Sequence, residues 1–498
     1  MQLLGYDIGS SSIKASIVDA ESGLQIAFAQ SPEKELTIQS PRKGWAEQDP
    51  NVWWKHVKAT TARLLDSDNV QKEAIAAIGI SYQMHGLVIV DENKEVLRPS
   101  IIWCDGRAVD SGSEITEELG EAYSLSHLLN KPGNFTASKL KWVKEHEPDL
   151  FQKIFKFMLP GDFIAMKMTG QINTSVSGLS EAILWDYKKH GLATEVMHAA
   201  GIPENVVPEI FTNFGQHGKL SERAADELGL PSGILLSYRA GDQPNNALSL
   251  NAMDPGEIAS TAGTSGVIYG VTDKPLYDKQ SRVNTFVHVN HNEDLQRYGV
   301  LLCINGTGIQ NSWLKNEVFN SELDYRAMNE RAESVAVGSD GLSIIPFGNG
   351  PERILQDTDT GAYIGKINFN RHRRAHITRA AHEGIAFSLC HGLDIMQEMG
   401  ISIESIRAAS SNMFQSRVFR ETLCNCANVP LDLYETNGAL GAAIGAGIGA
   451  GIFSDREEAF KGLQKKGSVD PDPKQRDEYL RAFDEWQLTL KKILETEA

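Results

Sequence analysis

Three short apolar runs, separated by turns of small and polar residues, open the chain. They cover residues 3–7, 13–18 and 24–29, and the turns between them contain Gly, Ser, Asp and Glu. Apolar runs of this length, bounded by such turns, are typical of neighbouring strands in an antiparallel sheet. We therefore predict a strand meander at the start of the chain.

A helix and a buried strand are predicted after this meander. Residues 51–65 follow Asp49, a good N-cap residue, and Pro50, which suits the first helical position. Residues 74–81 form an Ile-rich run that ends at the segment Gln83-Met84-His85-Gly86. Because ligand contacts in α/β proteins are usually made where a strand ends, this segment is a candidate binding site.

A second polar segment follows a predicted hairpin. Residues 87–91 and 96–103 are apolar runs on either side of a turn at residues 91–94, and they lead into Trp103-Cys104-Asp105-Gly106-Arg107. We expect this segment to converge with residues 83–86. The following stretch, to about residue 230, alternates amphipathic helices with polar turns and shows no obvious catalytic set, so we expect it to shape a pocket.

The pattern of strand, Gly-hydroxyl turn and strand occurs twice. Residues 3–19 read LLGYDIGSSSIKASIVD, and residues 257–273 read EIASTAGTSGVIYGVTD. Such internal similarity indicates a chain built from two related halves. We predict an α/β protein with an N-terminal domain at 1–245 and a C-terminal domain at 246–498.

The second half contains several further elements. We predict a long helix at 378–399, a strand at 405–409, a helix at 417–427, a strand at 431–434 and a charged amphipathic helix on the surface within 470–498. Residues 438–451 are dense in Gly and Ala, which favours a thin helix against which another backbone packs closely. The alternative adds a nucleotide contact at its N-terminus, where helix amides favour anions.

Charge and composition narrow the function classes. The net charge of -17 repels nucleic acid and anionic membranes, so neither is an expected partner. The start of the chain lacks a signal-peptide pattern, and no run of ~18 apolar residues occurs. The five cysteines are odd in number, and only Cys424 and Cys426 lie close together in the sequence. We therefore expect a cytoplasmic protein with structural cysteines. A P-loop kinase is excluded because no G-x-x-x-x-G-K-[ST] motif occurs.

A carboxylate and a phosphate-sized turn lie close together in the middle of the chain. Asp242 follows an apolar run at residues 233–238, and the turn Gly263-Thr264-Ser265-Gly266 comes about twenty residues later. A carboxylate can accept a proton from a hydroxyl group, while backbone N–H groups of small residues can bind phosphate. The alternative is that Asp242 caps a helix starting at Pro244 and that the turn is an ordinary hairpin. The second copy of the turn favours phosphoryl transfer.

Taken together, these motifs resemble the FGGY carbohydrate kinases, from the first residue to about Gly451. The resemblance rests on the order and spacing of Asp7-Ile8-Gly9-Ser10, residues 83–86, residues 103–107, Gly241-Asp242 and residues 263–266. It implies two ribonuclease-H-like domains of the actin-like ATPase type with a cleft between them, the first binding sugar and the second binding nucleotide. It implies ATP, Mg²⁺ and a small-molecule sugar as partners, and it leaves a homodimer open.

The resemblance also implies roles for individual residues. Asp242 is expected to act as the general base and Asp7 to hold Mg²⁺ largely through water, with Asp242 as a second metal contact. Contacts to ATP are expected from Ser10, Ser11, Lys14, Gly263, Thr264, Ser265, Asn412 and Gly438. Strand alternation leaves open that Lys14 points into solvent. Sugar contacts are expected from Met84, His85, Trp103, Asp105 and Gln243, and a structural ion pair from Arg107.

Within this family resemblance, the Met-His-Gly and Trp-x-Asp-Gly-Arg motifs imply D-xylulose, phosphorylated at its 5-hydroxyl, as the sugar in place of glycerol or gluconate. Two departures from the family pattern leave alternatives open. Gln243 stands where many members have Asn, and Ser411-Asn412-Met413-Phe414 stands where the family usually has Gly-Gly-Gly-Ala. The alternatives are a kinase for ribulose or another pentulose or polyol, and a catalytically weak sugar-sensing ATPase.

Overall fold

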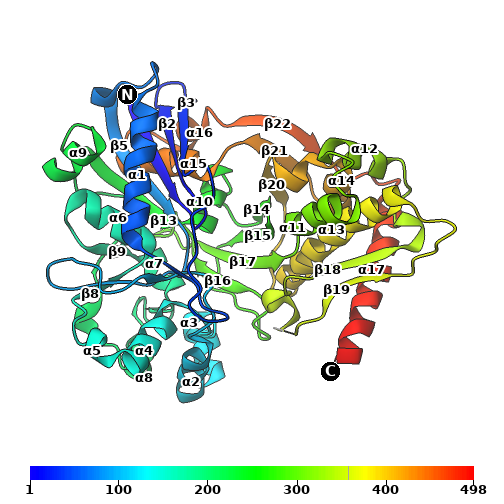
Figure 1. Cartoon of the computed structure of the whole chain (residues 1–498), viewed down its shortest axis with the longest axis horizontal. Coiled ribbons are helices and arrows are strands. Elements are labelled where there is room, and N and C mark those ends of the chain that lie inside the picture. Colours follow the sequence, from blue (N-terminus) through cyan, green and yellow to red (C-terminus); the bar gives the residue numbers. More distant parts are fainter. Residues whose placement is uncertain (357, 498) are drawn as a thin grey trace. The chain divides into compact units, whose positions relative to one another are not determined.

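The computed structural model describes residues 1–356 and 358–497 of a mixed α/β chain (Figure 1). The described residues form two compact units, and neither unit is continuous in sequence. Unit 1 comprises Met1–Asn251, Thr285–Tyr298 and Thr436–Leu463, and unit 2 comprises Ala252–Asn284, Gly299–Glu435 and the described residues from Gln464 on.

The main sheet of unit 1 runs in the order β13-β5-β1-β2-β3. β2 is antiparallel to β1 and β3, whereas β5 is parallel to β1 and β13, so the predicted meander is confirmed. The strands are β1 (Gln2–Ile8), β2 (Ile13–Asp19), β3 (Gln25–Ser31), β5 (Ile75–Tyr82) and β13 (Leu235–Gly241).

Helices and short strands complete unit 1. Helix α1 (Pro50–Leu65) begins after Asp49, whose side chain accepts a hydrogen bond from the amide of Asn51, so the predicted cap is confirmed. The other helices are α2 (Val109–Leu119), α3 (Glu121–Leu128), α4 (Thr136–His146), α5 (Pro148–Phe151), α6 (Pro160–Thr169), α7 (Val176–Glu181), α8 (Thr194–Ala200), α9 (Glu222–Leu228), α10 (Asp242–Ser249), α15 (Gly438–Gly449) and α16 (Arg456–Phe460). The short strands are β4 (Glu47–Gln48), β6 (Val88–Val90), β7 (Ser100–Ile101), β8 (Lys156–Met158), β9 (Asn173–Ser175), β10 (Trp185–Asp186), β11 (Gly191–Leu192) and β12 (Glu209–Phe211).

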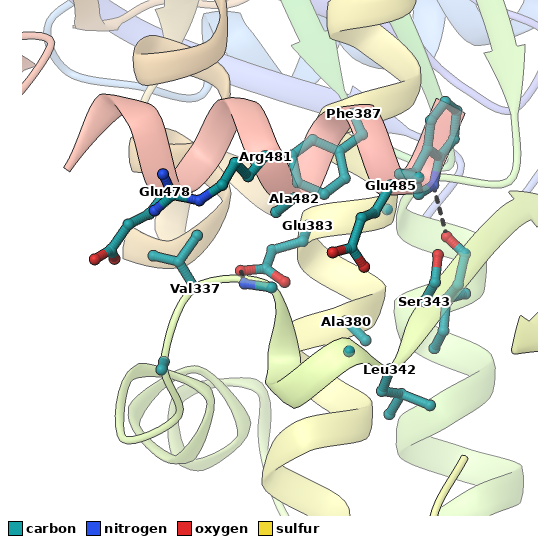
Figure 2. A pocket seen from close by; sticks show the side chains of 16 residues that line it. Val337, Leu342, Ser343, Ala380, Glu383, Phe387, Glu478, Arg481, Ala482 and Glu485 are labelled. Atoms are coloured by element: carbon teal, nitrogen blue, oxygen red, sulfur yellow. Dashed lines mark hydrogen bonds between the residues drawn. The ribbon is translucent and has the colours of Figure 1, made fainter. Parts of the chain in front are cut away.

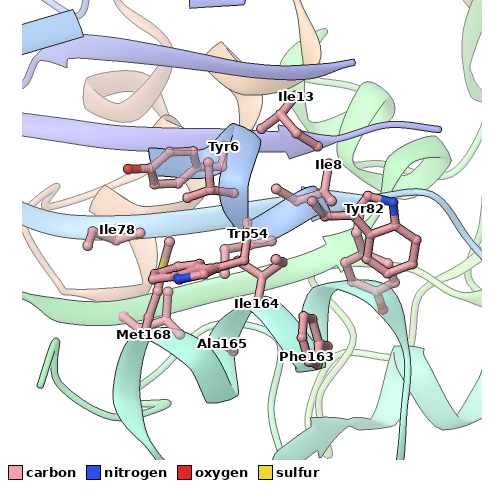
Figure 3. Close-up of a cluster of buried hydrophobic side chains, with 14 of the residues drawn as sticks. Tyr6, Ile8, Ile13, Trp54, Ile78, Tyr82, Phe163, Ile164, Ala165 and Met168 are labelled. Atoms are coloured by element: carbon pink, nitrogen blue, oxygen red, sulfur yellow. The ribbon is translucent and has the colours of Figure 1, made fainter. Parts of the chain in front are cut away.

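The core of unit 1 lies between its main sheet and helices α1 and α6. Trp53 of α1, Phe163 of α6 and Ile80 of β5 are buried there. Figure 3 shows Phe163 and Ile164 of α6 beneath the strands, one of which carries Tyr6. Burial of each large apolar side chain contributes about 1.5–3 kcal/mol, so the strand ends are held firmly in place.

Glycines allow helix α15 to pack directly on this sheet. A Cβ atom on Gly5 of β1 would lie 2.1 Å from the carbonyl oxygen of Ala439, and one on Gly79 of β5 would lie 2.0 Å from that of Ala442. The predicted thin helix, approached closely by another backbone, is therefore confirmed. The contact also places this late segment of the chain in unit 1.

The boundary predicted between residues 245 and 246 falls inside α10. The division into residues 1–245 and 246–498 stays a prediction. The two compact units are each made of several sequence segments, so they do not test a division at a single position.

The main sheet of unit 2 repeats the strand order of unit 1. Strands β17-β15-β14-β20-β21 correspond in order to β3-β2-β1-β5-β13, and β22 follows β21. In unit 1, β1 pairs antiparallel with β2 and parallel with β5. In unit 2, β14 pairs in the same way, antiparallel with β15 and parallel with β20. The internal similarity between residues 3–19 and 257–273 therefore reflects a shared topology.

The remaining elements belong to unit 2 or to its boundary with unit 1. The strands are β14 (Glu257–Ala262), β15 (Ser265–Thr272), β16 (Asn284–Val287), β17 (Tyr298–Asn305), β18 (Ser343–Phe347), β19 (Gly361–Gly365), β20 (Ser405–Ala409), β21 (Leu431–Glu435) and β22 (Gln464–Val469). The helices are α11 (Gly308–Trp313), α12 (Tyr325–Glu333), α13 (Arg374–Glu398), α14 (Arg417–Ala427) and α17 (Arg476–Glu497). The predicted bounds of β20 and α14 are confirmed.

Two local predictions gain detail from the structure. The charged amphipathic surface helix predicted near the C-terminus is confirmed as α17, whose apolar face packs on the core of unit 2 through Tyr479, Phe483, Trp486 and Leu490. The hairpin predicted at residues 87–103 is borne out by antiparallel bridges from Leu87 to Ile101 and from Val90 to Val96. In addition, β6 pairs with β8 and β7 pairs with β4.

Candidate functional site

Asp7 lies where β1 reaches the edge of the sheet in unit 1. Its Oδ1 atom accepts a hydrogen bond from the hydroxyl of Ser81 at 3.1 Å. Lys14 stands directly opposite Asp7 in the β1–β2 ladder, so both side chains project from the same face of the sheet. The structure therefore removes the option that strand alternation turns Lys14 away from the site.

The N-terminus of helix α15 meets the carboxylate of Asp7. A Cβ atom on Gly438, the first residue of the helix, would lie 2.8 Å from Oδ2 of Asp7. Asn437 caps the helix by accepting a hydrogen bond from the amide of Leu440. Because a helix N-terminus carries partial positive charge, this end of α15 favours anions at Asp7.

Gly438→Ala is expected to lower turnover about tenfold. The added methyl group would displace the carboxylate of Asp7, and a catalytic group that is out of position slows the reaction. The melting temperature should change little, since Ala favours a helix. Gly467→Ala is the control, because a Cβ atom there meets no heavy atom within 4 Å. Steady-state kinetics and thermal unfolding of both variants test this expectation; equal turnover in the two would contradict it.

Asp242 is the first residue of helix α10, directly after β13. The N-cap of this helix is Gly241, so the alternative in which Asp242 caps a helix starting at Pro244 is wrong. Asp242 as a whole residue is half-buried. Burial, and then the negative charge of Asp7, raise the pKa of Asp242 to about 7. Asp242 can therefore exchange a proton near neutral pH.

Parallel strands bring these acidic residues together. β1, β5 and β13 run parallel, so Asp7, the segment after β5 and Asp242 lie at the same edge of the sheet. The described residues contain no group of three or more His, Cys, Asp or Glu side chains that could hold a metal ion. A pair of carboxylates nevertheless suits Mg²⁺, which commonly takes one or two carboxylates and completes its shell with water and phosphate oxygens.

Met84 and His85 follow β5 beside Asp242. Met84 is buried, and its Cγ atom lies 2.6 Å from the position of a Cβ atom on Gly241. The ring of His85 lies edge-on to Phe135, with their centroids 4.7 Å apart. Gln243, partly exposed, donates hydrogen bonds to Asp242 through its backbone and its side chain. The structure thus brings the predicted sugar contacts Met84, His85 and Gln243 close to Asp242.

Trp103 and Asp105 have different surroundings. Trp103 is 41% exposed, and its indole Nε1 donates to the hydroxyl of Ser10 at 3.3 Å. Asp105 is fully buried, and its carboxylate accepts hydrogen bonds from the amide of Ala46 and from Arg107. A direct sugar contact by Asp105 is therefore not supported, because protein donors already occupy its carboxylate.

The structural ion pair predicted for Arg107 is confirmed. Its guanidinium group lies 2.7 Å from a carboxylate oxygen of Asp105 and 2.7 Å from one of Glu47. It also stacks over Trp45, with 3.8 Å between Cζ and the ring centroid. These contacts anchor the segment that carries Trp103.

The turn between β1 and β2 presents hydroxyl groups. It is closed by a hydrogen bond of 3.1 Å from the amide of Gly9 to the carbonyl of Ser12. Ser10 is partly exposed and Ser11 is exposed. Both are therefore accessible to a ligand at this edge of unit 1.

Hydrogen bonds with residues 305–308 fix the corresponding turn of unit 2 at residues 263–266. The carbonyl of Gly263 accepts hydrogen bonds from the amide of Gly308 (2.8 Å) and the hydroxyl of Thr307 (3.0 Å). The hydroxyl of Ser265 donates to Oδ1 of Asn305 at 3.1 Å. These contacts fix the turn while its outer side faces a cavity.

This cavity, of about 510 Å³, lies entirely in unit 2. It is lined by Ala262, Gly263, Thr264, Gly308, Ile309, Asn311, Ser312, Tyr325, Asn329, Asn412, Met413, Gln415 and Ser416. His382 braces one wall, because its ring nitrogens contact the side chains of Asn311 and Ser416. Its small and amide side chains suit a ligand that combines an anionic tail with a polar ring.

In the altered run Ser411-Asn412-Met413-Phe414, Asn412 adopts a backbone conformation that is typical of glycine. Its φ angle is 52°, a left-handed conformation that Gly adopts freely and Asn tolerates better than most residues. Phe414 is buried in the core of unit 2, where it packs against Phe419, and Met413 is also largely buried. The bulky residues of this run therefore need not fill the cavity.

Sequence analysis missed two buried ionisable residues beside His85. Glu181 ends α7 and Lys139 lies on α4. Both belong to the stretch in which we expected no catalytic set. Nothing in the sequence pattern marks them, because their burial depends on long-range packing.

Two family models match the chain. The one described as "FGGY family of carbohydrate kinases, N-terminal domain" matches residues 2–249, and the one described as "FGGY family of carbohydrate kinases, C-terminal domain" matches residues 258–450. A bilayer-crossing helix is not found in the described part of the chain, where no helix has the required length and hydrophobicity.

Curated relatives align along almost the whole chain. The xylulose kinase of Bacillus subtilis is 28% identical and covers 97% of this chain and 95% of its own length. The xylulose kinase of Klebsiella pneumoniae is 26% identical, with corresponding coverages of 96% and 98%.

Solved structures share the fold. The xylulose kinase from Rhodospirillum rubrum matches with a TM-score of 0.87 at 24% identity, covering 100% of both chains. A gluconate kinase from Lactobacillus acidophilus (TM-score 0.89, 22% identity) and a glycerol kinase from Plasmodium falciparum (0.86, 21%) each cover 99% of this chain and 98% of their own. The predicted actin-like, two-domain fold class is therefore confirmed.

Proposed function

Because this chain belongs to the FGGY family of carbohydrate kinases, we propose that it transfers the γ-phosphoryl group of ATP to the 5-hydroxyl of D-xylulose. The observation that supports the site most strongly is the position of Asp242. It lies beside Asp7 and next to Met84 and His85, and its pKa is raised to about 7.

Asp242 is proposed to accept the proton of the attacking hydroxyl. An ordinary Asp, with a pKa of ~3.9, is a weak base at neutral pH. With a pKa of about 7, the carboxylate form dominates only above that pH, and it binds a proton more strongly than an ordinary Asp. Since phosphoryl transfer has a loose transition state, Asp242 also contributes by holding the attacking oxygen in line.

Asp7 is proposed to hold Mg²⁺, with Asp242 as a second contact. The ion supplies positive charge that neutralises the phosphate oxygens when it is bound. Ser81 keeps the Asp7 carboxylate oriented, and Gly438 leaves room for it. Ser10, Ser11 and Lys14, which lie on the adjoining turn and strand, are proposed to contact phosphate oxygens.

The cavity of unit 2 is proposed to bind the nucleotide. Backbone amides and hydroxyls of Gly263, Thr264 and Ser265 suit phosphate groups. Asn412 lies beside the turn, with its side-chain nitrogen 3.5 Å from the position of a Cβ atom on Gly263. Because Asn412 keeps the backbone conformation of a glycine, the altered run gives little ground for a catalytically weak sugar sensor.

D-Xylulose is proposed as the sugar because the curated relatives that span the chain are named xylulose kinases. Gluconate and glycerol kinases share the fold, so the nearest alternative is a kinase for another pentulose or polyol. We also propose that the enzyme acts in the cytoplasm on free sugar and ATP; a homodimer stays a prediction.

Purified enzyme with ATP and Mg²⁺ is expected to release ADP with D-xylulose and to prefer it by at least about tenfold in kcat/KM over D-ribulose, L-ribulose, glycerol and gluconate. ADP release coupled to NADH oxidation measures this, with mass spectrometry of the sugar phosphate as confirmation. A stronger preference for another sugar would replace D-xylulose, and sugar-independent ATP turnover would contradict the kinase.

A further inference from the structure

The backbone of His85 adopts a conformation that is unusual for a residue with a side chain. Its φ angle is 61°, in the left-handed region that Gly occupies freely. A strained residue at the end of a strand persists only where surrounding contacts hold it, and such residues concentrate at functional sites.

Two buried ionisable side chains hold His85 from opposite sides. Oε2 of Glu181 accepts a hydrogen bond from the amide of His85 at 3.3 Å, and Nζ of Lys139 donates to its carbonyl oxygen at 2.8 Å. Glu181 is 1% exposed and Lys139 is 0% exposed. Buried ionisable groups are costly unless paired, so these contacts are specific features of the loop.

The imidazole ring is also fixed. Its Nδ1 atom lies 3.1 Å from the carbonyl oxygen of Glu181. A carbonyl oxygen only accepts, so this contact places a hydrogen on Nδ1, and Nε2 of the neutral ring becomes an acceptor. Phe135 and Phe286 both contact the ring, with centroids 4.7 and 5.3 Å from its own.

We propose that Glu181 and Lys139 are positioning residues that hold His85 in its left-handed conformation and present Nε2 to a sugar hydroxyl. This inference rests on the proposed function, because it assumes a sugar beside His85. Neither residue needs to touch the sugar itself. Their effect should therefore appear in sugar binding more than in the chemical step.

The shape and hydrogen bonds of Glu181 suggest a conservative variant. Burial raises the pKa of Glu181 well above its ordinary value. Its Oε1 accepts a hydrogen bond from the hydroxyl of Tyr82 at 2.7 Å. A neutral Gln has nearly the same shape and can accept from the amide of His85, whereas Ala cannot.

The test is a double-mutant cycle on the full-length enzyme. Glu181→Ala is expected to raise the sugar KM about tenfold while kcat and the KM for ATP change by less than about threefold. Glu181→Gln should stay within about threefold of wild type. In the His85→Ala background, Glu181→Ala should have no further effect on the sugar KM, because it acts through His85.

Tyr82→Phe is the matched control, because it removes the partner of Oε1 and leaves that of Oε2; it should behave like wild type. Lys139→Met, run through the same cycle, serves if Glu181→Ala does not fold. Additive effects of positions 85 and 181, or an unchanged sugar KM in Glu181→Ala, would overturn the proposal. A wild-type enzyme that phosphorylates no sugar would instead overturn the proposed function.

Discussion

Asp242→Asn is expected to lower kcat by about 10³-fold, within the range attributed to general-base catalysis. The amide keeps the size of the side chain but accepts a proton far less readily than the carboxylate. Met84 and His85 remain in place, so the Kd for sugar should change by less than about fivefold. Stopped-flow turnover and isothermal titration with the sugar measure the two quantities separately.

Gln243→Asn is the control for this variant. It alters the same turn of α10, which holds both residues, but it keeps the carboxylate. It also restores the Gly-Asp-Asn pattern of many family members, so kcat should stay within about threefold of wild type. Near-normal turnover by Asp242→Asn would remove this residue from its proposed role.

Asp7→Asn is expected to lower kcat by about 10²-fold or more, because the metal and phosphates lose a charged anchor. It should also shift the acidic limb of residual kcat/KM to lower pH. The charge of Asp7 raises the pKa of Asp242, so its removal lets Asp242 lose its proton at lower pH. Titration of activity with Mg²⁺ and a pH profile measure both effects.

Ser81→Ala is the matched control for Asp7→Asn. It removes the hydroxyl that donates to Asp7 and leaves the negative charge in place. Its kcat should fall by less than about tenfold, and its acidic limb should stay near that of wild type. An unshifted limb in Asp7→Asn would contradict the electrostatic coupling between the two aspartates.

Local patterns in the sequence predict much of the fold because the elements involved have clear caps and turns. The helix after Asp49 and the strand and helix at residues 405–409 and 417–427 lie where expected. Helix α15 also forms as predicted, but its place in unit 1 depends on glycines in β1 and β5, more than 350 residues away in the chain. No local pattern contains that information.

Helix α17 forms as the amphipathic pattern predicts. Tyr479, Phe483, Trp486 and Leu490 recur at helical spacing and make one buried face in an otherwise charged helix. A cavity of about 380 Å³ lies beside α17, and Figure 2 shows Arg481 and Glu485 of α17 and Glu383 of α13 among the side chains that line it.

The candidate site was predicted where chemistry follows the ends of strands. Asp7 lies near the end of β1, and Asp242 directly follows β13. Because these strands are parallel in one sheet, both residues lie at the same edge of it. Asp105 could not be placed this way, because its burial depends on Arg107 and on the amide of Ala46. Glu181 escaped notice for the same reason.

A crystal structure of the enzyme with D-xylulose and a non-hydrolysable ATP analogue tests the central claim most directly. We predict that a carboxylate oxygen of Asp242 lies within about 3.2 Å of the 5-hydroxyl, with that hydroxyl directed at the terminal phosphorus of the analogue. A bound sugar whose hydroxyls all lie beyond hydrogen-bond reach of Asp242 would contradict the account.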